Sequence, residues 1–307
     1  MKNIINYFLS LFNLRIIKNS TFLNINSKDD KFNDLSVEIN SLKEQMYLSK
    51  SEYTKMIISL KWDLIDILEN EEKKEKNTSC PICGNVEKIE LVKTFISECI
   101  FLGGKLERYK CSCCGVIYGP DKVLKLADNK LGEEYRLHYS VFSEGDSTES
   151  EIRSFFTLNP KKGKKYLNYG AGSWSKTIEK LRSDGWDVYG YEPFSSNDEN
   201  IPYIITSSEQ LETIKFDGIF SNNVLEHLRY PITELKYISS HLKPSGKLAM
   251  ATPCFEYLYE YTRFHLFFFT GESKYILADK ACLNVDDFIV DGEFMCMLYT
   301  PKKDVVS

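Results

Sequence analysis

The sequence predicts an α/β fold, with a mostly parallel sheet that follows a small cysteine-rich domain and a helical N-terminal extension. Three observations indicate this order. Residues 1–78 contain no glycine and have helix-compatible composition, and residues 79–125 hold two Cys-x2-Cys pairs. After a polar connector at 126–150, residues 151–307 alternate strand-like apolar runs with helix-like patterns. Strands separated by helices are typical of a parallel sheet built from βαβ units.

The helical extension carries an apolar repeat that alternates steps of four and three residues, with Ser49 as its polar break. The members of the repeat are Leu35, Ile39, Leu42, Met46, Tyr53, Met56 and Leu60. This spacing is that of a coiled-coil seam, which favours a homodimer. The alternative is an amphipathic helix that lies on the neighbouring domain of the same chain.

The first twenty residues, "MKNIINYFLSLFNLRIIKNS", are apolar but are interrupted by Asn6, Asn13 and Arg15. These interruptions fit neither a transmembrane helix nor a secretory signal. The favoured interpretation is a helix packed on its own protein or on a second subunit, and peripheral membrane contact is the alternative. The sequence therefore predicts a cytoplasmic protein with reduced or metal-bound thiols.

Four cysteines in residues 79–125 have the spacing of a metal site. Cys80 and Cys83 form one pair, Cys111 and Cys114 form the other, and a glycine follows each pair. Two such turns present four thiolates to one ion, which suits a closed, structural Zn²⁺ site in a zinc ribbon. An iron–sulfur centre is the alternative. Cys113 is left out of the predicted ligand set because only one residue separates it from Cys111.

A glycine loop, "YLNYGAGSWS" at 166–175, joins a predicted strand to a predicted helix. Gly170 and Gly172 allow a ligand to approach the backbone closely. Glu192 ends the next strand, twenty residues after Gly172, where an acid binds the ribose hydroxyls in nucleotide-binding βαβ folds. The third glycine of a dinucleotide-binding loop is absent, because position 175 is serine.

The order of "YLNYGAG", "YGYEP", "FDGIFSNNVLEHL" and "PITELKYISSHLKPSGKLAMATP" resembles class I S-adenosylmethionine-dependent methyltransferases over residues 160–300. The resemblance implies a Rossmann-like domain with a reversed final strand and S-adenosylmethionine as cofactor. It implies cofactor contacts from the following residues: Asn168, Tyr169, Gly170, Ala171, Gly172, Trp174, Glu192, Asn222 and Asn223. In the family an acid usually stands where this chain has Asn168, and a glycine where it has Trp174. Asn168 predicts weaker binding of the methionine ammonium of the cofactor, and Trp174 predicts a reshaped pocket at that end. A domain that has lost activity is the extreme alternative.

Some methyltransferases that act on sugars and surface polysaccharides carry a similar pair of cysteine knuckles, so the resemblance implies a sugar, nucleotide-sugar or glycan acceptor. Methylation of a hydroxyl is favoured, and methylation of a carbon or an amine is the alternative. His227 next to Glu226 is the predicted general base, and His265 is the second candidate. Arg263 is predicted to bind an anionic acceptor group. Tyr257, Tyr259 and Tyr261, which alternate at a spacing of two, are predicted to form an aromatic acceptor wall. For each of these residues a purely structural role is the alternative. No catalytic metal is expected.

The charge balance argues against a dedicated nucleic-acid binder. The formal net charge is −5, and no long block of lysine and arginine occurs. Two other functions remain open: a non-catalytic scaffold built on a methyltransferase-like domain, and a nucleic-acid methyltransferase.

Overall fold

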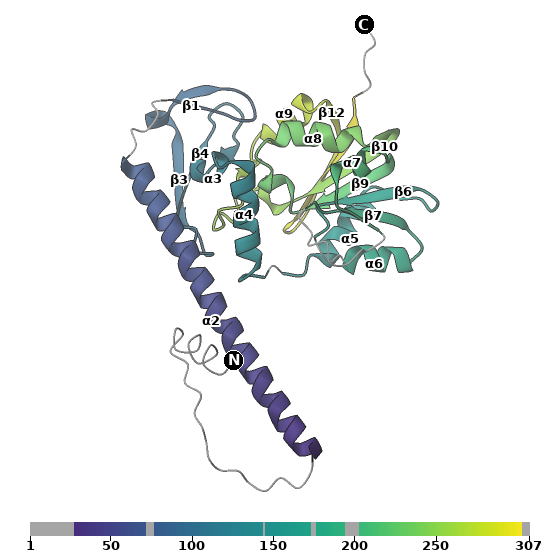
Figure 1. Ribbon diagram of the computed structural model, residues 1–307. Helices are drawn as coiled ribbons and strands as arrows, with labels where there is room; N and C mark the ends of the chain where they lie inside the picture. Colours follow the sequence, from purple (N-terminus) through teal and green to yellow (C-terminus); the bar gives the residue numbers. More distant parts are fainter. Residues whose placement is uncertain (1–27, 72–76, 144, 173–175, 194–202, 303–307) are drawn as a thin grey trace. The chain divides into compact units, whose positions relative to one another are not determined.

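A computed structural model describes residues 28–71, 77–143, 145–172, 176–193 and 203–302 (Figure 1). The chain forms two compact units, Met1–Tyr53 and Thr54–Ser307. The described part of the first unit lies within one helix, α2 (Lys28–Glu71). The predictions for residues 1–20 and for Trp174 concern residues outside the described ranges.

A seven-stranded sheet forms the centre of the second unit, in the order β12-β13-β10-β9-β6-β7-β8. Strand β13 runs antiparallel to both of its neighbours, β10 and β12, and the other pairs are parallel, which confirms the predicted parallel sheet with a reversed final strand. The strands are β6 (Lys165–Tyr169), β7 (Asp187–Tyr191), β8 (Ile204–Ile205), β9 (Phe216–Asn222), β10 (Leu242–Ala251), β12 (Leu283–Asp291) and β13 (Phe294–Pro301).

Helices cover both faces of this sheet, α5 and α6 on one and α8 and α9 on the other (Figure 1). Because successive strand residues point to opposite faces, Ile219 joins the cluster beneath α8, while Phe220 packs with Phe155 of α5. Burial on both faces explains why the strands read as continuous apolar runs. The helices of this region are α5 (Thr148–Thr157), α6 (Lys176–Ser183), α7 (Ser208–Glu212), α8 (Pro231–Ser240) and α9 (Ser273–Lys280), with 3₁₀ turns η2 (Leu225–His227) and η3 (Pro253–Phe255).

The cysteine-rich region contains two small antiparallel sheets. One pairs β1 (Asn77–Ser79) with β2 (Val86–Lys88), and the other has the order β11-β5-β4-β3. The second sheet takes its fourth strand, β11 (Phe267–Phe268), from the far end of the chain, because Phe268 pairs with Ile117 and Phe267 with Tyr118. The four-stranded sheet therefore contains strands from both sides of the boundary predicted at residue 125. The remaining elements here are η1 (Ile89–Leu91), β3 (Lys93–Glu98), β4 (Lys105–Lys110), β5 (Ile117–Tyr118), α3 (Asp121–Leu124) and α4 (Asp128–Tyr139).

One face of helix α2, in its part after Tyr53, packs against the cysteine-rich region and α4. Ile58 and Trp62 are almost fully buried, and the Trp62 indole donates to Glu134 Oε2 at 3.0 Å. Asp66 accepts from the Lys105 amide at 2.8 Å and also pairs with Lys122. These contacts anchor the end of the helix. None of the described helices combines the length and the apolar character needed to cross a bilayer.

Candidate functional site

The candidate site lies where the order of the parallel strands reverses. Strand β6 stands between β9, which continues the sheet in one direction, and β7, which continues it in the other. At such a switch point the loops after neighbouring strands diverge and leave a crevice at the carboxyl ends of the strands. The loop after β6 and the end of β9 carry the glycines and asparagines that the sequence singles out.

The glycine loop after β6 is shaped by two residues with left-handed backbone. Gly170 has φ +77° and Gly172 has φ +72°, and a Cβ at Gly170 would lie 2.5 Å from Val224 Cγ2. The amides of Gly170 and Ala171 both donate to the Tyr191 carbonyl, at 2.9 and 3.1 Å. These bonds tie the loop to the end of β7, so the two amides do not form an anion cradle.

Glu192 follows β7 directly and lies beside the same loop. Its carboxylate accepts from the Gly172 amide at 3.0 Å, and its own amide donates to the Ile205 carbonyl at 3.0 Å. The carboxylate is thereby held at the mouth of the loop, where a ribose would lie in a nucleotide-binding βαβ unit.

Asn168 has a carboxylate partner from a helix that the sequence did not associate with this site. It lies near the end of β6 with 1% of its surface exposed, and its Nδ2 donates to Glu151 Oε2 at 2.7 Å. Ser147 donates to the other carboxylate oxygen of Glu151 at 2.5 Å. The Asn168 Oδ1 atom is buried without a hydrogen-bond partner in the described part of the chain. An acceptor left in this state indicates a missing donor, since buried polar groups are normally satisfied.

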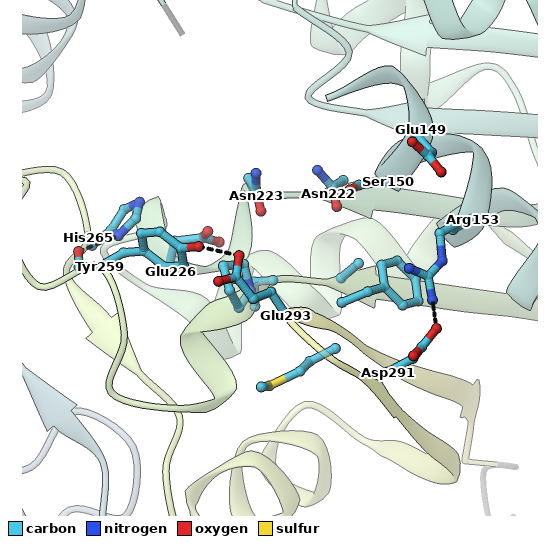
Figure 2. A pocket seen from close by; sticks show the side chains of 15 residues that line it. Glu149, Ser150, Arg153, Asn222, Asn223, Glu226, Tyr259, His265, Asp291 and Glu293 are labelled. Atoms are coloured by element: carbon cyan, nitrogen blue, oxygen red, sulfur yellow. Dashed lines mark hydrogen bonds and ion pairs between the residues drawn. The ribbon is translucent and has the colours of Figure 1, made fainter. Parts of the chain in front are cut away.

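A cavity of about 550 Å³ opens beside the carboxyl ends of β9 and β10 (Figure 2). Asn222 and Asn223 line it next to each other, and the Asn222 Nδ2 atom is buried without a described partner. Asn223 has φ +54°, a left-handed conformation that asparagine tolerates better than most residues. The rest of the wall comes from α5, from η2, from the end of β10 and the segment after it, and from the β12–β13 hairpin: Glu149, Ser150, Arg153, Glu226, Ala251, Thr252, Pro253, Tyr259, His265, Asp291, Glu293, Phe294 and Met295.

The charged side chains of this cavity are mostly acidic. Arg153 is its one described cation, and its guanidinium pairs with Asp291 Oδ2 at 2.6 Å and lies 4.0 Å from the ring centroid of Phe294. Glu293 accepts the phenol proton of Tyr259. Together with Glu149 and Glu226, this leaves the cavity with more carboxylates than cations, a composition that repels phosphate groups.

His265 and Glu226 both line the cavity, and Cys254 lies beneath them. Ligand atoms of the three residues lie within 4.8 Å of one another. His265 Nδ1 is 3.1 Å from the Tyr259 carbonyl, so this nitrogen carries the proton and Nε2 is left as an acceptor. Burial holds the pKa of His265 well below its usual value, and the imidazole is therefore neutral at pH 7.

His227, the first predicted base, does not belong to the cavity wall. Its Nδ1 donates to the Phe264 carbonyl at 3.0 Å, and its ring lies against His265 with 5.0 Å between centroids. Burial lowers the pKa of His227 to about 4. The structure thus brings Glu226 and His265 together at the cavity and places His227 behind them.

Arg263 and Tyr257 are placed differently from their predicted substrate roles. Arg263 is completely buried, donates to the Phe101 carbonyl at 2.8 Å and lies 3.8 Å from Glu134. This burial contradicts the predicted contact with an anionic acceptor group. Tyr257 lies in an aromatic cluster, 4.7 Å from Phe95 between centroids, and of the three tyrosines predicted to form the acceptor wall Tyr259 lines the cavity.

The loop that carries Tyr259 and His265 is fastened to the cysteine-rich region by Arg108. This arginine lies on β4 with no exposed surface. Its guanidinium donates to the carbonyls of Glu260 at 2.7 Å, Thr262 at 2.7 Å and His265 at 3.1 Å. One buried cation thereby fixes three carbonyls of the cavity loop.

The four predicted metal ligands converge. Cys80 and Cys114 have their sulfurs 3.6 Å apart, and Cys83 and Cys111 have theirs 3.5 Å apart. All four sulfurs lie within 4.8 Å of one another, whereas Cys113 is exposed and outside the group. Tetrahedral Zn²⁺ with Zn–S bonds of about 2.3 Å needs sulfurs about 3.8 Å apart, so the four thiols fit a closed zinc site.

Sequence reasoning did not identify the residues of α5 and of the β12–β13 hairpin. Glu149, Glu151 and Arg153 precede the first strand of the domain, and Asp291 and Glu293 follow its last helix. The available signal was the run of acids in the first turn of α5, which is also the ordinary composition of a helix N-terminus. Only the folded chain shows that these two distant segments meet at one cavity.

Comparison with known proteins agrees with this geometry. Residues 146–276 match a family model described as a methyltransferase domain. A tRNA U34 carboxymethyltransferase from Pseudoalteromonas translucida (strain TAC 125) is 31% identical over 109 residues, which cover 31% of this chain and 34% of that protein. The chain thus spans about a third of the length of this curated relative.

Among solved structures, similarity is found to the 1,6-didemethyltoxoflavin-N1-methyltransferase of Burkholderia thailandensis, with bound 1,6-didemethyltoxoflavin and S-adenosylhomocysteine. It has 14% identity and a TM-score of 0.46, and the match covers 64% of this chain and 96% of that one. The mitomycin 7-O-methyltransferase MmcR matches with 15% identity and a TM-score of 0.40, over 57% of this chain and 58% of that one. Residues 146–276 are therefore similar to a methyltransferase domain, and the strand order with its one reversed strand agrees with the fold of class I methyltransferases.

Proposed function

We propose that the protein transfers a methyl group from S-adenosylmethionine to a hydroxyl of a sugar or glycan acceptor. The observation that carries this proposal is the continuity of the site, in which Asn222 and Asn223 line the cavity one strand away from the glycine loop and two strands away from Glu192. The cofactor would occupy the loop and the acceptor would occupy the cavity. A role in surface polysaccharide biosynthesis in the cytoplasm is part of the proposal and rests on the resemblance alone.

The residues at the loop fit the cofactor. Glu192 is positioned for the two ribose hydroxyls. The buried Asn168 Oδ1 offers an acceptor, and the Glu151 carboxylate beside it restores the negative charge that an asparagine at this position lacks. A carboxylate oxygen accepts more than one hydrogen bond, so Glu151 can hold Asn168 and an ammonium group together. Asn222 Nδ2 is a buried donor without a described partner, so the site offers the cofactor both an acceptor and a donor.

The cavity favours an uncharged acceptor. Its acids outnumber its one paired arginine, which disfavours the diphosphate of a nucleotide-sugar and the backbone of a nucleic acid. When bound, the cofactor supplies an electrophilic methyl group, and the protein has to align the acceptor and take its proton. The neutral Nε2 of His265 is the acceptor atom for that proton, with Glu226 close enough to stabilise the resulting cation.

The first experiment measures cofactor binding by calorimetry with S-adenosylhomocysteine. The wild-type protein is expected to bind in the micromolar range, and Glu192→Ala is expected to bind at least about tenfold more weakly. Glu209→Ala, an exposed acid on the neighbouring helix α7, is the matched control. Absence of binding to wild type would favour a non-catalytic scaffold.

The second experiment measures transfer of labelled methyl from S-adenosylmethionine to a panel of acceptors. Free sugars and neutral oligosaccharides are expected to accept methyl, and nucleotide-sugars to accept it poorly. Glu149→Gln and Glu293→Gln together remove two negative charges from the cavity, and in this variant the discrimination against phosphate is expected to shrink. Equal transfer to both acceptor classes by wild type would contradict the proposed acceptor.

A nucleic-acid acceptor is the alternative, because the matched relative from Pseudoalteromonas translucida is named as a tRNA enzyme. The acidic cavity and the net charge of −5 are unfavourable for a polyanion. Incubation with bulk tRNA and labelled cofactor tests it directly. Label incorporated into tRNA, with binding that weakens steeply as salt rises, would replace the glycan proposal.

We further propose that the cysteine-rich region holds one structural Zn²⁺. Cys80, Cys83, Cys111 and Cys114 leave no open position for a substrate. The metal would therefore stabilise the region that carries Arg108.

A further inference from the structure

Helix α2 carries a stripe of exposed apolar side chains at heptad spacing. The exposed fractions are 44% at Ile39, 46% at Leu42, 65% at Met46, 61% at Tyr53, 51% at Met56 and 60% at Leu60. A soluble protein rarely leaves such a row of large apolar side chains in water, because covering them is worth about 25 cal/mol per Å². We call this row the α2 stripe.

The α2 stripe is not the face with which the helix packs on its own chain. That contact uses Ile58 and Trp62, which are 1% and 0% exposed, whereas Met56 and Leu60 on either side are half exposed or more. The two interpretations of the sequence, a coiled-coil seam and a helix that lies on its own chain, therefore apply to different faces of one helix. One face packs against the cysteine-rich region, and the α2 stripe is left for another partner.

The charges that flank the stripe indicate which partner fits. With Ile39, Met46 and Tyr53 at position a of the heptad, Leu42 and Met56 fall at position d. Position e then holds Lys43 and Lys50, and position g holds Glu38 and Glu52. A second copy of the chain carries the same arrangement, so the stripe can pair with itself.

The same charges select the orientation of the two copies. In a parallel pair, position g of one helix faces position e of the next heptad in the other, which places Glu38 opposite Lys43 twice per dimer and Gln45 opposite Lys50. In an antiparallel pair, e would face e and g would face g, which would oppose lysine to lysine and glutamate to glutamate. The charge pattern thus favours the parallel arrangement and opposes the other.

We infer that the α2 stripe is the interface of a parallel, in-register homodimer. The helix does not present the basic face that would suit an anionic membrane, because acids and lysines alternate along the flanks of the α2 stripe. Dimerisation covers Ile39 to Leu60 and leaves the Ile58 and Trp62 face on its own chain.

Sedimentation velocity of the full-length protein over a range of micromolar concentrations tests the interface. The expected mass is twice the 35.6 kDa of one chain. Leu42→Asp puts a charge at a buried d position of the seam in both copies, and the dissociation constant is expected to rise at least about a hundredfold. A wild-type protein that stays monomeric, including one whose stripe instead binds vesicles of anionic phospholipid, overturns the inference, as does a dimer that Leu42→Asp leaves intact.

Charge exchange tests the orientation. Glu38→Lys alone, or Lys43→Glu alone, creates two like-charge pairs in a parallel dimer and is expected to weaken it about tenfold. The double variant restores opposite charges and is expected to return to within about twofold of wild type. Glu44→Lys makes the same charge change at position f, away from the seam, and is the matched control. A double variant weaker than both single variants would refute the parallel arrangement.

Discussion

Replacing Arg108 with methionine removes the buried guanidinium that holds the cavity loop. Methionine keeps most of the buried apolar contact of the side chain but donates no hydrogen bond. The carbonyls of Glu260 and Thr262, each 2.7 Å from the guanidinium, and that of His265 at 3.1 Å, would lose their charged donor. Because Tyr259 and His265 lie on this loop, the change reaches the cavity without altering any residue that lines it.

The size of the effect follows from the number of bonds and from the cost of burying the cation. A hydrogen bond to a charged group contributes about 1.5–3 kcal/mol, and three of them are lost. This loss is partly offset because methionine avoids the free-energy cost of desolvating the guanidinium. The same desolvation lowers the pKa of Arg108. We expect a net loss of about 3–5 kcal/mol in the free energy of unfolding, the range measured when one member of a buried charged network is removed.

Urea unfolding and hydrogen exchange measure the two consequences separately. The midpoint should fall without a change in the slope of the transition, and the amides of residues 256–269 should exchange faster in native buffer. Calorimetry with S-adenosylhomocysteine should give an affinity within about twofold of wild type, because the glycine loop and Glu192 lie outside the altered contacts. Arg108→Lys is the control that retains the charge but not the forked geometry, and it should fall between the two.

Two results would refute this reasoning. The first is a methionine variant destabilised by less than about 1 kcal/mol, which would mean that the carbonyls find other donors. The second is unchanged hydrogen exchange in residues 256–269 together with a large loss of cofactor affinity. That result would mean that Arg108 supports cofactor binding and does not hold the loop.

Three further outcomes are expected. Cys80→Ser should lose bound zinc by mass spectrometry of the native protein, whereas Cys113→Ser should retain one equivalent, because only Cys80 belongs to the group of four sulfurs; equal retention would contradict the ligand set. Trp62→Ala should lower the free energy of unfolding by about 3–5 kcal/mol in urea, because it empties a fully buried site and leaves a carboxylate without its indole partner; a loss below about 1 kcal/mol would contradict the packing of α2. Stability should fall by about 2–5 kcal/mol between pH 7 and pH 4.5, since burial lowers the pKa of His138 and of His227 to about 4 while unfolded histidines titrate near 6.5 and bind protons first; a flat profile in denaturant titrations over this range would show that the two rings stay hydrated.

The sequence predicted those parts of the protein whose chemistry is local. The spacing of Cys80 and Cys83 is enough to place two sulfurs on one turn, and the glycines after β6 are enough to predict a turn with left-handed residues. The parallel sheet follows from the alternation of apolar runs and helical patterns, because short connections leave few arrangements. Each of these inferences needs only residues that are close together in the chain, whereas the reversed final strand was implied by the resemblance to class I methyltransferases.

What the sequence did not predict depends on contacts between distant segments. Arg263 looked like an exposed cation in an aromatic loop, but its partners Phe101 and Glu134 come from segments more than a hundred residues earlier. Asn168 looked like a lost acid, and the carboxylate of Glu151, on the preceding helix, accepts a hydrogen bond from it. No periodicity or motif connects such pairs, since the contact exists only after α4 and α5 have packed.

The pairing of β11 with β5 connects the cysteine-rich region to the loop that carries Tyr259 and His265, although the region lies far from the glycine loop in the sequence. Strand β11 follows His265 by one residue, so the loop that closes the cavity is held at its end by a strand of the cysteine sheet and in its middle by Arg108. A metal that orders β4 and β5 would therefore order the cavity proposed for the acceptor and leave the loop proposed for the cofactor to the main sheet. Loss of the metal should impair acceptor binding before it impairs cofactor binding, and the ratio of the two affinities in a chelated sample distinguishes this arrangement from a zinc site that only stabilises the fold.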